Sequence, residues 1–258
     1  MSTAPTPEQI QADIDFAVQT AREAGARLLG LRESGRWPDE KIMGDVGDQA
    51  ADGYLQGYLR GRYPADGILS EETIDSPERL ERARTWIVDP LDGSSDFGYS
   101  AHWSVHVALV VDGEPQAAAV AVPGWDTTWS TAPPPSRLPS AVESGRPPRI
   151  VVARSRSRFD GGRLQQALGA EVYAVGSAGV KAMAVVRGEV DAYVHGGGLY
   201  EWDSCAPVAV ARAAGLMCCH LDGSELRFNK PDPWSPGLVI ARPGLVDQIV
   251  DVMADRQP

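Results

Sequence analysis

The sequence predicts an α+β N-terminal half followed by an α/β C-terminal half, and three observations support this division. The first 132 residues combine two long helical patterns with a strand hairpin. Residues 133–148 contain six prolines and little apolar periodicity, which is typical of a connector. From residue 149 to residue 258, short apolar strands alternate with helical segments. We therefore expect an α+β subdomain over 1–132, a Pro-rich connector over 133–148 and an α/β subdomain over 149–258.

The composition limits the possible classes of function. The chain has 258 residues, and 43% of them are hydrophobic, which is enough for a substantial core. Its formal net charge of −11 argues against nucleic acid or a membrane surface as a partner. Its three cysteines form neither a disulfide framework nor a zinc spacing. Because we find no signal peptide and no long apolar run, we expect a cytoplasmic protein.

Two helices are predicted in the N-terminal half. Thr6, Pro7 and Gln9 form a helix start, because Thr6 can cap, proline fits the first position and Gln9 completes a capping box. Apolar residues then recur at helical spacing to about Leu29. A second helix is predicted from Gln49 to Arg62, which places Asp48 at its start, where the default role of an aspartate is a cap.

Short strands follow these helices. Ile68–Leu69 and Trp86–Asp89 are apolar and flanked by polar residues. Apolar residues alternate from Val105 to Val111, and an Asp-Gly turn then leads into the returning segment Ala117–Val122, which predicts a hairpin.

Strands and helices alternate in the C-terminal half. The expected strands are Ile150–Ala153, Val172–Val175, Asp191–His195 and Leu238–Ala241. The expected helices are Phe159–Leu168, Val180–Arg187, Asp203–Ala214, which Gly215 closes, and Pro243–Asp255.

The segment Trp86–Ser94 is the most informative part of the chain. It places Asp89 and Asp92 three residues apart around Pro90, directly after an apolar strand. Proline fixes its own φ and biases the preceding residue to an extended conformation, so we expect both carboxylates on a short, stiff loop beyond the strand end. Mg²⁺ prefers such oxygen ligands. A Gly-Ser-Ser turn follows and could open a helix whose free N–H groups face an anion.

Other acidic residues stand at strand ends or helix starts. Glu71 and Glu72 follow the strand Ile68–Leu69, and Asp203 begins a helix. Taken singly, each is better explained as a solvated loop residue or a helix cap. Their joint occurrence with Asp89 and Asp92 favours a common site, because such ends gather at one edge of a layered fold.

The order of these residues resembles the inositol monophosphatase family, which comprises Mg²⁺-dependent, lithium-sensitive phosphatases. The matching features are Glu71-Glu72, the segment Asp89–Ser94, and Trp202-Asp203 followed by Gly215. The resemblance covers nearly the whole chain and implies a layered αβαβα sandwich and, as in many relatives, a homodimer. Three further segments are similar to the branch that removes the 3′-phosphate from adenosine 3′,5′-bisphosphate: Gly176–Ala184, Asp191–His195 and Glu201–Pro207.

The resemblance implies two Mg²⁺ ions and a third, weaker one. Glu71, Asp89 and the Leu91 carbonyl would bind the first ion. Asp89, Asp92 and Asp203 would bind the second. Asp48 would help to hold the third ion or its water, and Glu71 with Ser94 would orient and deprotonate the attacking water.

Substrate contacts are also implied. The backbone N–H groups of Gly93 and Ser94 would take phosphate oxygens, and Gly176 and Ser177 would offer N–H groups at a helix start. For Lys181 a ligand role is favoured over a solvated helix position. For Arg154 and His195 the alternatives stay open. Arg154 is either a contact to the second phosphate or the base of the substrate, or part of a solvated basic loop. His195 is either a sugar contact or a core residue. The remaining histidines, His102, His106 and His220, have no expected role.

One alternative keeps the same chemistry: a monophosphatase for inositol, histidinol or a nucleoside. Another alternative, of a different class, is a metal-binding protein without catalytic activity. Two departures from the family pattern bear on this choice. Ser94 stands where threonine is usual, and Asp96 where asparagine is common.

Overall fold

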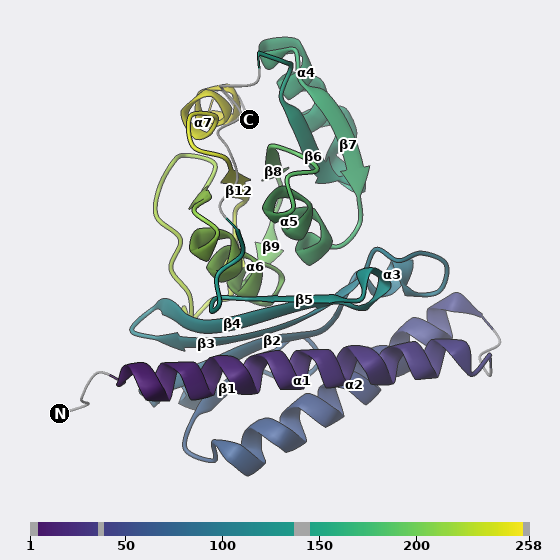
Figure 1. Ribbon diagram of the computed structural model, residues 1–258, viewed down its shortest axis with the longest axis vertical. Coiled ribbons are helices and arrows are strands. Elements are labelled where there is room, and N and C mark those ends of the chain that lie inside the picture. The colour runs from purple at the N-terminus through teal and green to yellow at the C-terminus, as the bar shows by residue number, and fades with distance from the viewer. Residues whose placement is uncertain (1–4, 36–38, 137–144, 255–258) are drawn as a thin grey trace.

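The computed structural model describes residues 5–35, 39–136 and 145–254 and arranges them in an αβαβα sandwich (Figure 1). The helices α1 (Pro7–Glu33) and α2 (Glu40–Arg62) cover one face of a first sheet. The helices α5 (Ala178–Val186) and α6 (Glu201–Ala213) lie between this sheet and a second one. Apolar side chains fill each boundary, so the core consists of stacked clusters and not of one centre. The expected sandwich is confirmed.

Helix α1 begins as its capping box predicts. The Thr6 N–H donates to Gln9 Oε1 at 2.8 Å, and the Gln9 N–H donates to Thr6 Oγ1 at 3.3 Å. The helix then buries an Ala-rich face against β3 and β4, since small side chains allow a helix to pack closely on a sheet.

Helix α2 corrects the prediction for its start. It begins at Glu40, and Asp39 caps it by accepting the Ile42 N–H at 2.8 Å. Asp48 therefore lies inside the helix and is not its cap. The first turns of α2 were not predicted because Gly44 and Gly47 have low helix propensity. Both are needed for packing: a Cβ on Gly47 would come within 2.9 Å of Leu91, and one on Gly44 within 3.1 Å of the Ser94 carbonyl oxygen.

The first sheet has the strand order β1-β2-β3-β4-β5. Its strands are β1 (Gly67–Ser70), β2 (Arg84–Asp92), β3 (Ser104–Val111), β4 (Glu114–Val122) and β5 (Thr127–Ser130). β1 runs parallel to β2, and the other neighbours are antiparallel. The predicted hairpin corresponds to β3 and β4. Strand β5 was not predicted, because its four residues carry no clear apolar alternation.

Strand β2 continues beyond its predicted end, so Asp89 and Asp92 lie on a strand and not on a loop. Asp89 is paired with His106 and Asp92 with Ser104, and the register shifts between these pairs. Three steps along β2 thus match two steps along β3, which describes a β-bulge. Pro90, which cannot donate to a ladder, lies within this bulge in an otherwise central strand.

The second sheet has the strand order β10-β12-β8-β6-β7. Its strands are β6 (Arg149–Ala153), β7 (Glu171–Val175), β8 (Ala192–His195), β10 (Met217–Cys219) and β12 (Leu238–Ala241). The strand β6 is parallel to β7 and β8, whereas β12 is antiparallel to β8 and β10. The helices α4 (Gly162–Leu168) and α7 (Val246–Ala254) cover its outer face (Figure 1).

The two sheets are separate in the sequence. The first ends at Ser130 and the second begins at Arg149. Of the predicted connector, residues 137–144 lie outside the described residues. Short strands β9 (Leu199–Tyr200) and β11 (Trp234–Ser235) pair beside the start of α6. Within the described ranges, no helix has the length and apolar character needed to cross a membrane.

Candidate metal centre

Three aspartates converge where the first sheet meets the middle helices. Asp89 and Asp92 come from β2, and Asp203 comes from the first turn of α6. One carboxylate oxygen from each lies within 4.8 Å of the others. The bulge explains the convergence of the first two, because Ser104 and His106, their partners two residues apart on β3, face the same side of the sheet. The predicted ligands of the second ion are thus brought together.

The Asp89 side chain has unused ligand capacity. It is fully buried, and Oδ1 accepts the Leu91 N–H at 3.1 Å, as in an Asx turn. Among the described residues, Oδ2 has no hydrogen-bond partner. A buried carboxylate oxygen without a partner is costly in a dry site. A cation bound between the carboxylates would satisfy it.

The raised pKa values of Asp89 and Asp203 also indicate that a positive charge would stabilise the ionised cluster. Burial raises the pKa of Asp89 well above its ordinary value, and the carboxylates of Asp92 and Glu71 raise it further. Burial and Asp92 likewise raise the pKa of Asp203 to about 6. Like charges at this separation resist ionisation, and a divalent cation would remove that penalty.

Asp92 is the exception within the cluster, because donors surround it. Burial alone would raise its pKa, but the His106 and Ser177 hydrogen bonds and the nearby cations His106 and Lys181 lower it below the ordinary value. Oδ2 accepts the Gly179 N–H at 2.7 Å and the Ser104 hydroxyl at 2.8 Å, and Oδ1 accepts the Ala178 N–H at 3.0 Å. The N-terminus of α5 therefore holds this carboxylate ionised.

Asp203 is oriented by the chain just before it. Its Oδ2 accepts the Tyr200 N–H at 2.7 Å, which completes a reciprocal cap at the start of α6. The side chain is thus both a helix cap and a member of the cluster, the two roles that the sequence offered as alternatives.

Glu71 and Asp48 lie around the three aspartates. Glu71 directly follows β1, whose parallel pairing with β2 brings its end beside Val88. Partial desolvation and the carboxylates of Asp203 and Asp92 raise the pKa of Glu71 to about 7, although part of its surface is exposed. Burial, Glu72 and Glu71 raise the pKa of Asp48 to about 8. These two groups interact electrostatically with the site although neither belongs to the close cluster.

Gly93 and Ser94 form the turn after β2. Gly93 has a φ of +89°, in the left-handed region that favours glycine, and a Cβ there would come within 2.9 Å of the His102 carbonyl oxygen. Ser94 then begins the one-turn helix α3 (Ser94–Phe97), against which α2 packs. The roles of Gly93, Ser94 and the Leu91 carbonyl stay predictions.

Two residues that were expected to contact the substrate, Ser177 and Lys181, form hydrogen bonds within the protein. Ser177 caps α5 by accepting the Val180 N–H at 3.0 Å, and its hydroxyl donates to Asp92. Lys181 is 1% exposed, and its Nζ donates to the carbonyls of Val175, Gly176 and Ser177. Burial lowers the pKa of Lys181 to about 8. In this arrangement Lys181 holds the Gly176 turn in place, so a direct substrate contact would require it to leave these carbonyls.

Arg154 and His195 approach the site from the second sheet. Arg154 pairs with the fully buried carboxylate of Asp96 and remains half-exposed. His195 Nδ1 lies 3.0 Å from the Tyr193 hydroxyl, and burial, with the charges of Lys181 and Arg156, lowers its pKa to about 4. His195 is therefore neutral at physiological pH.

Sequence reasoning missed His106 and Ser104, which contact the cluster from β3. His106 Nε2 lies 3.3 Å from Asp92 Oδ2, and Nδ1 lies 3.0 Å from the Trp202 carbonyl oxygen. One signal was available: both polar residues fall within a strand whose other side chains are almost all buried and apolar.

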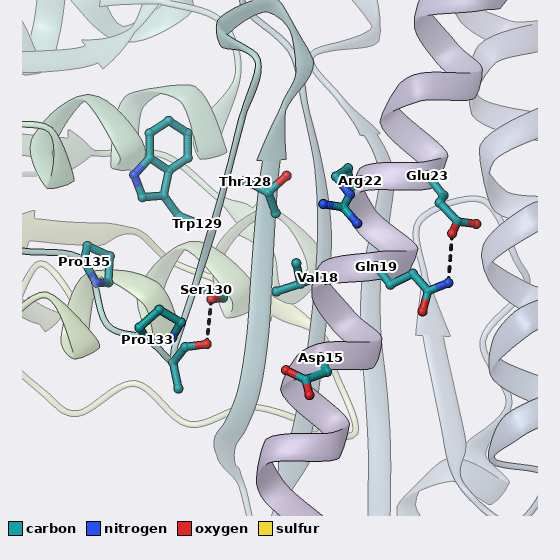
Figure 2. Close-up of a pocket in the computed structure, with 11 residues that line it drawn as sticks. Asp15, Val18, Gln19, Arg22, Glu23, Thr128, Trp129, Ser130, Pro133 and Pro135 are labelled. Atoms are coloured by element: carbon teal, nitrogen blue, oxygen red, sulfur yellow. Dashed lines mark hydrogen bonds between the residues drawn. The ribbon is translucent and has the colours of Figure 1, made fainter.

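A separate pocket lies away from this centre. This hollow, of about 540 Å³, lies between α1 and β5 and is bordered by Val18, Arg22, Thr128 and Trp129, which Figure 2 labels. None of the clustered aspartates lines it, and its described side chains include no cluster of metal ligands. The clustered aspartates are therefore the candidate metal site.

Known proteins are similar to this chain over most of its length. A profile of the inositol monophosphatase family matches residues 10–248. The 3′-phosphoadenosine 5′-phosphate phosphatase of Mycobacterium leprae (strain TN) is 40% identical over 94% of both chains. The 3′(2′),5′-bisphosphate nucleotidase CysQ of Escherichia coli (strain K12) is 28% identical over 88% of this chain and 99% of its own.

Solved structures give the same fold. An inositol monophosphatase of Staphylococcus aureus MSSA476 superposes with a TM-score of 0.80 at 20% identity, covering 93% of this chain and 95% of its own. One from Anabaena superposes with a TM-score of 0.79 at 21% identity, covering 96% and 98%. On the family match, the 40% identity and the shared fold, this chain belongs to the inositol monophosphatase family.

Proposed function

We propose that this protein is a Mg²⁺-dependent phosphatase that removes the 3′-phosphate from adenosine 3′,5′-bisphosphate, and from its sulfated form, by attack of water. The observation that carries the proposal is the convergence of Asp89, Asp92 and Asp203, together with a buried oxygen of Asp89 that has no hydrogen-bond partner among the described residues. Oxygen ligands of this kind select a hard divalent cation. The substrate follows from the similarity to the mycobacterial phosphatase.

The carboxylates would hold the cations and set their places. Asp89 would serve both ions, with Glu71 and the Leu91 carbonyl as the further ligands of the first and Asp92 and Asp203 as those of the second. When bound, the divalent cations would supply charge neutralisation for the entering and leaving oxygens of phosphoryl transfer. Asp48 would help to hold a third, weaker ion or its water.

Glu71 is suited to accept the proton of the attacking water. With cations bound, its carboxylate would stay ionised, the form that is able to accept a proton. The Ser94 hydroxyl, at the start of α3, would orient the same water. The N–H groups of Gly93 and Ser94 would hold the phosphate.

The remaining part of the substrate would meet the second sheet. Arg154, exposed on one side and paired with Asp96 on the other, offers a guanidinium to a second phosphate. Neutral His195 offers a hydrogen bond to a ribose hydroxyl. Gly176, Ser177 and Lys181 would line the substrate site between Arg154 and His195.

Phosphate release from a panel of substrates, with and without Mg²⁺ and Li⁺, tests the proposal. The panel includes adenosine 3′,5′-bisphosphate, inositol 1-phosphate, histidinol phosphate and nucleoside monophosphates. We expect the bisphosphate to be hydrolysed with the highest kcat/KM, only with Mg²⁺, and with inhibition by Li⁺. Faster hydrolysis of inositol 1-phosphate would reassign the substrate, and no hydrolysis of any member would leave a binding protein. A cytoplasmic location and a homodimer remain predictions for fractionation and for size-exclusion chromatography.

A further inference from the structure

His106 contacts both structural elements that carry the clustered aspartates. It lies on β3 directly opposite Asp89, and its side chain is fully buried. One ring nitrogen faces α6 and the other faces Asp92 on β2. A histidine in this position is able to fix the distance between the two elements.

The contact with α6 sets the orientation of the ring. His106 Nδ1 lies 3.0 Å from the carbonyl oxygen of Trp202, the residue before Asp203. A carbonyl oxygen only accepts, so Nδ1 must carry a proton and donate it. The hydrogen bond therefore ties the first turn of α6 to the middle of β3.

The other side of the ring completes the surroundings of Asp92. His106 Nε2 lies 3.0 Å from Ser104 Oγ and 3.3 Å from Asp92 Oδ2. Ser104 Oγ also lies 3.0 Å from Ser177 Oγ, so these groups form one buried network. A Cβ on Gly179 would overlap both His106 Nε2 and Ser104 Oγ, which leaves the ring little freedom to move.

We propose that His106 is a positioning residue that holds Asp92 and the start of α6 in the arrangement a divalent cation requires. The clustered carboxylates repel one another before a cation arrives, and a rigid bridge between β2 and α6 resists their separation. Groups that orient metal ligands in this way typically contribute a factor of about 10–100 to metal affinity. The inference rests on the proposed metal-dependent function.

Calorimetric titration of the full, metal-free chain with Mg²⁺ tests the proposal without turnover. His106→Leu fills similar space but removes both ring contacts, and we expect Mg²⁺ to bind roughly 10–100 times more weakly. His106→Asn keeps an amide N–H that can reach the Trp202 carbonyl, and its affinity should fall between those of the leucine variant and the parent. His220→Leu is the matched control, because His220 Nδ1 also lies 3.1 Å from a carbonyl, that of Gly237, away from the cluster.

The outcomes separate this inference from the proposed function. A parent protein that binds no Mg²⁺ would overturn the proposed function. A folded His106→Leu protein with parental Mg²⁺ affinity, or an equal loss in His220→Leu, would overturn the role of His106 alone. If His106→Leu does not fold, His106→Asn decides: a loss of more than about threefold supports the role, and a smaller one contradicts it.

Discussion

Asp89 and Asp92 face the same side of β2 because the strand bulges between them. Asp89 pairs with His106 and Asp92 with Ser104, so three residues on β2 span two on β3. In a regular strand, residues three apart point to opposite faces. Without a bulge, a separation of three residues would place the two carboxylates on opposite faces. The bulge at Pro90 and Leu91 brings them to the same face.

Asp89→Asn should abolish Mg²⁺-dependent turnover. The substitution keeps the shape of the side chain but removes the charge of the central ligand, and we expect kcat/KM to fall by roughly a thousandfold or more. Steady-state phosphate release measures the loss. Asp247→Asn, on the outer helix α7, is the matched control and should behave as the parent. Activity in Asp89→Asn within about tenfold of the parent would contradict the site.

The metal-free protein should lose stability as the pH rises from 6.5 to 8. The pKa of Glu71, about 7, and that of Asp48, about 8, lie above their ordinary values of 4.5 and 3.8. The folded chain therefore binds more protons than the unfolded chain in this window, and stability falls with pH. Lys181, whose pKa is lowered to about 8, acts in the opposite direction mainly above the window.

Thermal unfolding in EDTA measures this effect. The unfolding temperature should be lower at pH 8 than at pH 6.5, and Glu71→Gln should reduce the difference. Saturating Mg²⁺ should raise the unfolding temperature most at pH 8, since the cation replaces protons on the same carboxylates. A flat or rising profile without metal would show that Glu71 and Asp48 ionise normally in the folded state.

Ser94 distinguishes water positioning from structural support. Ser94→Ala should lower kcat by roughly 10–100 times with little change in KM, because the hydroxyl would act on water and not on substrate. Ser94→Thr keeps the hydroxyl and adds a methyl group that stiffens χ1, so its kcat should equal or exceed that of the parent. Parallel measurement of kcat and KM for both variants tests this role. A tenfold loss of kcat in Ser94→Thr would show that Ser94 matters for packing against α2 and not for positioning water.

The sequence was sufficient for features that depend on local chemistry. The capping box of Thr6 and Gln9 and the hairpin of β3 and β4 were predicted because their signals lie within a few residues. The convergence of Asp89, Asp92 and Asp203 was expected from the family pattern, which carries long-range information that periodicity does not.

Other features depend on contacts between distant segments. Helix α2 begins at Glu40 because Gly44 and Gly47 admit close neighbours from α3 and β2, which outweighs their low helix propensity. His106 was assigned no role because its partners, Asp92 and Trp202, are far from it along the chain. The carbonyl groups that accept hydrogen bonds from Lys181 belong to residues only a few positions away in the sequence. The sequence alone does not show that the Lys181 ammonium group turns back toward them.

Arg154 should determine the preference for a second phosphate. Its guanidinium is anchored by Asp96, near the Gly176 turn, and its other side is exposed. A charge-assisted hydrogen bond contributes about 1.5–3 kcal/mol, so Arg154→Ala should raise KM for adenosine 3′,5′-bisphosphate by roughly 10–100 times. The KM for adenosine 3′-monophosphate, which lacks the 5′-phosphate, should hardly change. Arg158→Ala, an exposed arginine of the same segment, is the control; equal losses for both substrates would assign Arg154 to the structure of the loop instead of to recognition.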